Sequence, residues 1–500
     1  MFSKVLVANR GEIAVRVLQT LQAMGIATVA VYSDPDKNAP HVTLADQAYS
    51  LNGVSAEETY LDSKKLIALA KESRAEAIHP GYGFLSENPS FCADCTAAGL
   101  VFIGPNSDTI SPLGDKIRSK DTAIRAGVPV VPSSPLWEPG ETHHEGFLSQ
   151  CGFPLLVKAT AGGGGRGMRL VEREAELLPA LESASREAAS AFGDGRVFLE
   201  RFFPAARHVE FQVLADASGN TIHLMERECS VQRRYQKVIE ETPSPALDRK
   251  LRESMGESAV ALAKSAGYTN AGTVEFLVDP TTGQYYFLEM NARIQVEHPI
   301  TEETLRMDLV QWQVRIAAGE NLTLSQNDIR SSGHALECRI YAEDAYDNFA
   351  PSTGTLLSWQ PPHGMGLRLD SGVSQGQEVT PYYDSMLAKL VSWGTDRQAS
   401  INRMSKALEN FPVVGVTTNI PFLMRAIHHP AFTSGNYDTR FVAMYGELTA
   451  PGDNGRIDAA AMELAEDFWQ ASVHKRAGTR TTGQDRPQGP WESLGRASFP

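Results

Sequence analysis

Polar side chains occupy every second position of one short segment, FLEMNARIQVEHPITE, which spans residues 287–302. Glu289, Asn291, Arg293, Gln295 and Glu297 alternate there with apolar residues. Because successive side chains of a strand point to opposite faces, this period of two predicts a strand with one polar face. A solvated edge strand would show the same period, but it would more commonly carry Thr, Lys and Ser outward. The polar face is therefore a candidate lining for a cleft.

A run of glycines lies between two apolar stretches in FPLLVKATAGGGGRGMRLV, residues 153–171. Consecutive glycines let backbone N–H groups approach an anion closely, which suits the phosphates of a nucleotide. The run is not a Walker A loop, because GKS or GKT is missing and a strand follows. We expect a hairpin flap over phosphates, with a merely flexible loop as the alternative. Another basic group, taken alone, predicts only a solvated face: Arg227, Arg233, Arg234 and Lys237.

Carboxylates placed within apolar strands predict a metal site. Glu275 lies in the middle of AGTVEFLVD, where a lone carboxylate would be costly without a partner, and Glu289 offers a matching strand. With the Asn291 amide they supply the hard oxygen ligands that Mg²⁺ uses together with substrate phosphates. We therefore expect a metal–ATP clamp, since phosphoryl transfer depends mainly on positioning and charge neutralisation.

The composition is that of a globular protein with several domains: 500 residues, 42% hydrophobic and 21% charged. A formal net charge of -14 argues against nucleic acid or a membrane surface as the main partner. No apolar run is long enough to span a bilayer and no signal peptide is evident, so we expect a cytoplasmic protein. The five cysteines predict no disulfide framework, and Cys92 and Cys95 are expected to be buried helix residues.

The elements that position these residues begin with a βαβ unit, with a strand at 4–8, a helix at 12–24 and a strand at 27–32. Its turn, ANRGEIA, lacks GxGxxG, which disfavours a nicotinamide or flavin enzyme. After a strand near Ala77, the loop HPGYGFLSENP fits a ligand site or a tight connection equally well. An α+β middle follows from about residue 114, a strand-rich part from about 331, and a helical, then patternless, tail from about 448.

Ten motifs together resemble one family, the ATP-grasp biotin carboxylases. They are VANRGEIAVR, HPGYGFLSEN, GDK (114–116), KATAGGGGRGM, RHVEFQV, RECSVQRRYQKVIEE, GTVEFL, EMNARIQVEHPITE, GHALECRIYAED and PYYDSMLAKL, in family order between residue 5 and about 390. The resemblance implies a Rossmann-like N-terminal domain (1–113), an ATP-grasp domain (114–330) with a mobile glycine-rich lid (about 131–204), a mixed β C-terminal domain (331–447) and a tail (448–500).

Members of that family use ATP and bicarbonate to form carboxyphosphate, whose CO₂ is captured by biotin on a carrier domain. The resemblance implies that Glu297 is the general base and that Arg339 stabilises the biotin enolate, with Lys237 and Arg293 completing the catalytic set. It implies Mg²⁺ or Mn²⁺ on Glu275, Glu289 and Asn291, and bicarbonate on Lys237, Arg293, Gln295 and Val296. It implies ATP on Lys116, Lys158, Gly164, Gly165, Glu200, Arg201, Phe202, Phe203, His208, Tyr235, Glu275 and Glu289.

The chain departs from the family pattern in three places. Ala161 replaces a glycine, and Tyr235 replaces a histidine that contacts nucleotide, which leaves ATP affinity open. No Met is followed by Lys, so the biotin-accepting signature is absent and we expect a separate biotin carboxyl carrier protein and carboxyltransferase subunits. The family also implies a homodimer. The final acceptor stays open among acetyl-CoA, propionyl-CoA, methylcrotonyl-CoA and others.

Two other functions remain as alternatives. One is another ATP-grasp ligase with a different acceptor, and the other is a catalytically silent subunit that binds nucleotide. The RIQVEHP segment and Arg339 disfavour the first, because such a ligase needs no bicarbonate base beside a biotin arginine. Intact Arg293 and Glu297 disfavour the second.

Overall fold

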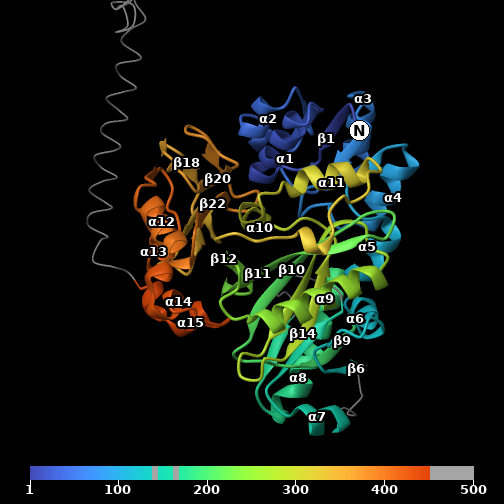
Figure 1. Cartoon of the computed structure of the whole chain (residues 1–500), viewed down its shortest axis with the longest axis vertical. Helices are drawn as coiled ribbons and strands as arrows, with labels where there is room; N and C mark the ends of the chain where they lie inside the picture. Colours follow the sequence, from blue (N-terminus) through green and yellow to red (C-terminus); the bar gives the residue numbers. More distant parts are fainter. Residues whose placement is uncertain (138–144, 161–167, 451–500) are drawn as a thin grey trace, which may run out of the picture. The chain divides into compact units, whose positions relative to one another are not determined.

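A five-stranded parallel sheet forms the N-terminal part of this computed structural model, which describes residues 1–137, 145–160 and 168–450 (Figure 1). Its strand order, β3-β2-β1-β4-β5, confirms the expected Rossmann-like fold. The βαβ unit is also confirmed, because β1 and β2 pair in parallel on either side of α1. The elements are β1 (Lys4–Val7), α1 (Gly11–Ala23), β2 (Ala27–Tyr32), α2 (Pro40–Leu44), β3 (Gln47–Ser50), α3 (Ser63–Glu72), β4 (Ala77–His79), α4 (Pro89–Ala97) and β5 (Val101–Phe102).

Helix α4 carries the two closely spaced cysteines into the core. Cys92 and Cys95 are buried and form no disulfide. Burial raises the pKa of the Cys92 thiol to about 11 and that of the Cys95 thiol to about 12. Both side chains are therefore neutral packing residues, as their apolar setting predicted.

An eight-stranded antiparallel sheet crosses the middle of the molecule, in the order β14-β13-β10-β11-β12-β15-β22-β20. It continues past the change in sequence pattern at residues 330–334, because β12 pairs directly with β15. The middle and C-terminal parts of the chain thus share one sheet. Its strands are β10 (Arg207–Ala215), β11 (Thr221–Arg233), β12 (Gln236–Thr242), β13 (Asn270–Val278), β14 (Tyr285–Asn291), β15 (His334–Tyr341), β20 (Leu367–Ser371) and β22 (Met386–Gly394).

Helices cover this sheet and leave its polar residues facing a cleft. The helix α9 packs on β10 and β11 (Figure 1), and α12 packs on β22 and β15. The helices of these layers are α5 (Ser107–Gly114), α6 (Lys116–Arg125), α9 (Arg249–Ser265), α10 (His298–Leu305), α11 (Leu309–Ala317), α12 (Arg397–Glu409), α13 (Ile420–His428), α14 (Pro430–Thr433) and α15 (Phe441–Met444).

A separate four-stranded sheet, with its own apolar core, falls inside the range expected for the lid. The strands β7 and β8 pair as the two arms of the expected hairpin. The glycine run between them, including Ala161, Gly164 and Gly165, lies outside the described residues. The elements are β6 (Ser133–Trp137), α7 (Glu145–Cys151), β7 (Leu155–Ala159), β8 (Met168–Val171), α8 (Glu174–Phe192) and β9 (Val197–Arg201).

Short elements complete the C-terminal part. The two-residue strands are β16 (Glu343–Asp344), β17 (Ala350–Pro351), β18 (Gly354–Thr355), β19 (Ser358–Trp359), β21 (Glu378–Val379) and β23 (Val413–Val414), and the 3-10 turns are η1 (Asp34–Asp36), η2 (Gln326–Asp328) and η3 (Gly446–Leu448). Within the described ranges, every helix is too short or too polar to cross a membrane. The expected tail from residue 451 onward lies outside the described residues.

Candidate active site

A cavity of about 820 Å³ lies among the N-terminal part, the lid sheet and the large sheet. Of the predicted site residues that the structure describes, all except Glu297 line it. The predicted lining residues are Lys116, Lys158, Glu200, Arg201, Phe202, Phe203, His208, Tyr235, Lys237, Glu275, Glu289, Asn291, Arg293, Gln295, Val296 and Arg339. The structure therefore brings together residues that are more than two hundred positions apart in the chain.

The sequence predicted that the polar residues of segment 287–302 all lie on one strand, and this prediction was wrong. Strand β14 ends at Asn291, residues 292–297 are irregular, and α10 begins at His298. The backbone leaves the sheet where the Glu87 carboxylate accepts the Ala292 N–H at 2.8 Å and the Arg293 Nε–H at 2.9 Å. Apart from Glu297, these residues still line the cavity, because the irregular segment folds back toward Glu275.

Glu275 is the most heavily hydrogen-bonded carboxylate in this pocket. One of its oxygens, Oε1, accepts from Asn291 at 2.9 Å, Gln295 at 3.0 Å and Lys237 at 2.9 Å. The other oxygen lies 2.7 Å from Nε2 of His208. Burial alone would raise the pKa of Glu275, but Lys237 and His208 hold it below its usual range. Glu275 is therefore an ionised carboxylate, as a metal ligand has to be.

Glu289 lies directly opposite Glu275 on the neighbouring strand, as the sequence predicted. Burial and the charge of Glu275 raise the pKa of Glu289, which indicates two carboxylates facing one another with too little positive charge between them. A divalent cation would supply that charge. Asn291 now donates its amide N–H to Glu275 and accepts from Arg293 at 3.0 Å, so its amide would have to turn to offer oxygen to a metal. With that turn, the three residues fit Mg²⁺ or Mn²⁺.

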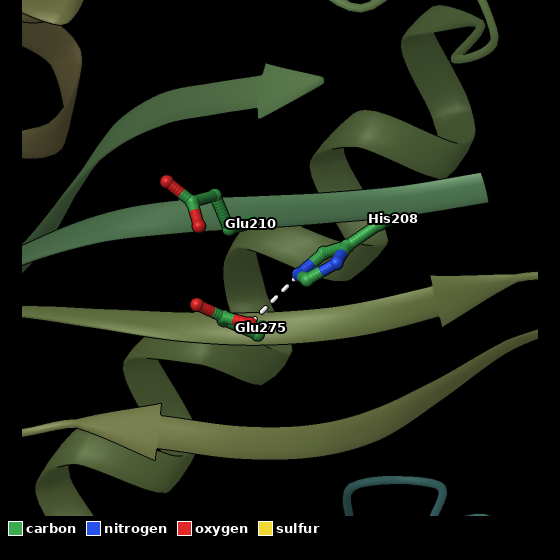
Figure 2. Close-up of side chains that lie close together, drawn as sticks. All are labelled: His208, Glu210 and Glu275. Atoms are coloured by element: carbon green, nitrogen blue, oxygen red, sulfur yellow. Dashed lines mark hydrogen bonds and ion pairs between the residues drawn. The ribbon is translucent and has the colours of Figure 1, made fainter. Parts of the chain in front are cut away.

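Lys237 joins the metal side of the cavity to the proposed base. Its ammonium lies 2.5 Å from Glu210, 2.9 Å from Glu275 and 2.7 Å from Glu297. Two acidic clusters close enough for a metal, His208–Glu210–Glu275 (Figure 2) and Glu210–Cys229–Glu297, surround this ammonium. Lys237 already provides their positive charge, so neither cluster needs an ion.

Glu297 is fully buried behind Lys237 and Arg339. Its second oxygen lies 3.0 Å from Nη2 of Arg339. Burial opposes ionisation, but Lys237, Arg339 and Arg227 hold the pKa of Glu297 well below its usual range. A carboxylate that is ionised and adjacent to two anion-binding side chains is placed to accept a proton from an anionic substrate.

Taken alone, the basic residues at 227–237 predicted a solvated face, and this prediction was wrong for Arg227 and Lys237. Arg227 is completely buried and bonds Glu210 at 2.5 Å, Gln212 at 2.8 Å and Thr301 at 3.0 Å. Lys237 is enclosed by carboxylates, while Arg234 is exposed. The sequence alone could not show this burial, because these partners of Arg227 come from another strand, β10, and from helix α10.

The opposite end of the cavity is built for a larger anion with an aromatic part. Glu200 is bonded by Lys158 and, at 2.9 Å, by Lys120. Although burial raises it, the pKa of Glu200 stays below its usual range because of these two lysines. The Phe203 ring stacks on Tyr286 at 4.9 Å between centroids, with the Arg201 guanidinium 4.9 Å from the Phe203 ring. Tyr235 is 56% exposed at the cavity edge.

Several residues of the site were not predicted from the sequence. Gln232 lies 2.7 Å from Nδ1 of His208, Glu87 holds Arg293, and Lys120 holds Glu200. Glu210 could have been found, since it stands two positions after His208 on one face of the alternating strand RHVEFQV. Glu87 lies in the HPGYGFLSENP loop, whose Tyr82, Gly83 and Phe84 line the cavity, so that loop is part of the site.

Three family models match successive parts of the chain. The N-terminal domain of biotin carboxylase matches residues 1–110, the ATP-binding domain of the carbamoyl-phosphate synthase L chain matches 115–325, and the C-terminal domain of biotin carboxylase matches 337–444. Biotin carboxylase 1 of Bacillus subtilis is 46% identical over 445 residues, which are 89% of this chain and 99% of that protein. The chain belongs to the biotin carboxylase family.

Another relative of this biotin carboxylase chain is one subunit of a larger enzyme. The small subunit of 2-oxoglutarate carboxylase from Hydrogenobacter thermophilus is 48% identical over 442 residues, which are 88% of this chain and 93% of that protein. A solved structure of the biotin carboxylase domain of that enzyme has a TM-score of 0.87 at 47% identity, over 91% of this chain and all of that one. It is a dimer in complex with MgADP, ADP and bicarbonate.

Proposed function

We propose that this cavity carries out the ATP-dependent carboxylation of biotin by bicarbonate, with each residue in the role that its position allows. The observation that carries the proposal is the chain of contacts from Glu275 through Lys237 and Glu297 to Arg339. It joins a metal–nucleotide end, an anion site and a second anion-stabilising arginine within one buried cluster. A protein that only bound nucleotide would not need the last two.

The nucleotide end positions ATP. Lys116, Lys158 and His208 would contact phosphates, and the segment from Glu200 to Phe203 would lie against adenine. Glu275, Glu289 and Asn291 would hold Mg²⁺ or Mn²⁺, which neutralises charge on the phosphates when it is bound. The Gly164 and Gly165 backbone would close over the same phosphates.

The anion end positions bicarbonate beside its base. Lys237, Arg293, Gln295 and the Val296 backbone would bind the anion, with the arginine fork gripping two oxygens. As a bicarbonate oxygen bonds to the γ-phosphorus, its proton passes to Glu297, and the bond from that phosphorus to the ADP oxygen breaks. The C–O bond of the carboxyphosphate then breaks to give CO₂ and phosphate, and the phosphate takes the proton from the ureido nitrogen of biotin. Arg339 would stabilise the biotin enolate that results, whose nitrogen bonds to the CO₂.

The relatives support a proposal about the protein partners of this chain. The Hydrogenobacter relative is one subunit of a carboxylase, and the solved structure of its biotin carboxylase domain is a dimer. We infer that this chain forms a homodimer in the cytoplasm and carboxylates biotin on a separate carrier protein for a carboxyltransferase subunit.

ADP release with free biotin and bicarbonate tests the proposed function. We expect ATP hydrolysis to need bicarbonate and to rise when free biotin is added. ATP hydrolysis whose rate depends on neither bicarbonate nor biotin would favour another ATP-grasp ligase. No ATP hydrolysis at all would favour a catalytically silent subunit.

A further inference from the structure

Arg339, which is proposed above to stabilise the biotin enolate, is bonded by a residue that lies outside the cavity. Oε1 of Glu240, on β12, lies 2.7 Å from Nε and 2.6 Å from Nη2 of Arg339, on β15. Arg339 lines the cavity, whereas Glu240 is fully buried and does not. Glu240 and Glu297 engage Nε and Nη2, and the Tyr341 side chain also bonds the Arg339 guanidinium. Glu240 thus sets the direction in which the guanidinium points.

A second acid faces Glu240 across the sheet. Glu337 pairs in register with Glu240 on the adjacent antiparallel strand, so their side chains project from the same face as near neighbours. Glu337 is fully buried. Within the described residues, neither Glu337 oxygen has a hydrogen-bond partner, and the same holds for Oε2 of Glu240. Three carboxyl oxygens of these two neighbouring residues are therefore buried without partners, which is costly for two ionised carboxylates.

The nearest cationic side chains, Lys389 and Arg339, form ion pairs with other acids. Lys389, on β22, lies 2.9 Å from Glu12 of α1, 3.6 Å from Asp370 of β20 and 3.0 Å from the Val296 carbonyl. Arg339 is engaged by Glu240 and Glu297. Neither cation forms an ion pair with Glu337 in the described structure.

Helices α10 and α12, which also pack on β15, add no ion pair to Glu337 within the described residues. On α10, burial holds the pKa of His298 well below its usual range, with Lys389 acting in the same direction, so this imidazole is neutral. Helix α12 covers the opposite face of β15, where Leu336, Cys338 and Ile340 enter an apolar core. A proton is the remaining way to neutralise the pair.

We propose that Glu337 is a protonated acid that donates a hydrogen bond to Glu240, and that Glu240, so fixed, is the positioning residue of Arg339. The carboxyl proton satisfies one orphaned oxygen of each residue and leaves a single negative charge facing the guanidinium. Burial and the charge of Glu240 raise the pKa of Glu337 well above its usual range, and burial raises that of Glu240 to about 7. The assignment of Arg339 to biotin rests on the proposed function, whereas the shared proton does not.

Infrared spectroscopy of the unliganded protein tests the proton directly. At neutral pH we expect a C=O band of a protonated carboxylic acid that disappears in Glu337→Gln. Glu257→Gln, at an exposed position on α9, is the matched control and should leave the band unchanged. A spectrum in which Glu337→Gln removes only a carboxylate band would overturn the shared proton, whatever the enzyme does with biotin.

Steady-state kinetics with free biotin test the positioning. Glu240→Gln removes a charged partner of Arg339, and we expect the KM for biotin to rise about 10-fold or more while the KM for ATP changes less than about 2-fold. Glu337→Gln should keep most of the biotin affinity, because its amide also donates to Glu240, whereas Glu337→Leu should resemble Glu240→Gln. Equal damage from Glu337→Gln and Glu337→Leu, or an unchanged biotin KM in Glu240→Gln, would contradict the proposal.

The pH dependence of thermal stability provides a further test if a variant is too unstable for kinetic measurements. A carboxyl whose folded pKa is raised binds a proton that the unfolded chain releases, so wild-type stability falls as pH rises above the ordinary glutamate range. Glu337→Gln lacks that group, and its melting temperature relative to wild type should rise from about pH 5 to about pH 8. A difference that stays constant with pH would contradict a protonated Glu337. If wild type shows no biotin-dependent ADP release, the proposed function fails, while the infrared and pH results still decide the proton.

Discussion

The roles of Lys237 and Arg227 depend on the residues that they contact in the fold. In the sequence they belong to one run of basic residues, but in the fold both contact Glu210, from opposite sides. Types and spacing predicted that Glu275 and Glu289 would face one another, since both lie in strands with a period of two. They did not predict Glu240 or Gln232 as partners, because those contacts join strands whose order in the sheet the sequence does not specify.

Replacing Arg227 by Met should destabilise the protein by about 3–5 kcal/mol, because Glu210 would be left buried with one of its two cations missing. Urea unfolding monitored by circular dichroism measures the change. Arg249→Met, which breaks an exposed pair with Glu253 on α9, is the control and should have little effect. An Arg227→Met variant as stable as that control would show that the buried pair is not needed.

At the scale of elements, the βαβ unit, the cysteine helix and the paired strands β13 and β14 were predictable, because local periodicity and turn residues specify them. The end of β14 at Asn291 was not. Its alternating pattern continues to Glu297, and only the contact from Glu87, about two hundred residues away, shows why the backbone leaves the sheet. Likewise, the pairing of β12 with β15 joins two parts of the chain that differ in pattern.

Glu241 ties β12 to β15 and to α12, and this tie should depend on pH. His334, Arg397 and Tyr437 all bond its carboxylate. Burial would raise its pKa, but hydrogen bonds from His334 and Arg397 lower it to about 2, against 4.5 ordinarily. A depressed carboxyl pKa stabilises the fold above pH 4.5, and this contribution is lost as pH falls toward 2. The difference corresponds to about 3 kcal/mol.

Urea unfolding of wild type and Glu241→Gln at about pH 6 and about pH 3 measures this effect. The variant should be less stable than wild type at the higher pH, and the gap should shrink by about 2 kcal/mol at the lower pH. Glu253→Gln, at an exposed position on α9, should show no such change. A gap of equal size at both pH values would show that the Glu241 charge does not hold these elements together.

At the scale of the whole molecule, the order of ten motifs indicated the family, and the family models and relatives established it. The final acyl acceptor could not be predicted, because the proposed carboxyltransferase subunit would select it. The glycine run and the chain after residue 450 lie outside the described residues, so the flap and the tail stay predictions.

A separate carrier makes a direct prediction about where the carboxyl group goes. With labelled bicarbonate, ATP and a purified biotinylated carrier protein, label should appear on the carrier and not on this chain. The same carrier without biotin is the control and should stay unlabelled. Label that remains attached to this chain, or none on any biotinylated carrier, would contradict the inferred partner.

One buried cluster is proposed to hold nucleotide, bicarbonate and its base, and this role depends most on Glu297. Glu297→Gln keeps the shape but removes the proton acceptor, so the rate of carboxybiotin formation from labelled bicarbonate should fall by about 10²–10⁴-fold. Binding of MgADP should be nearly unchanged, which shows that the site is still folded. Carboxylation at the wild-type rate would contradict the account.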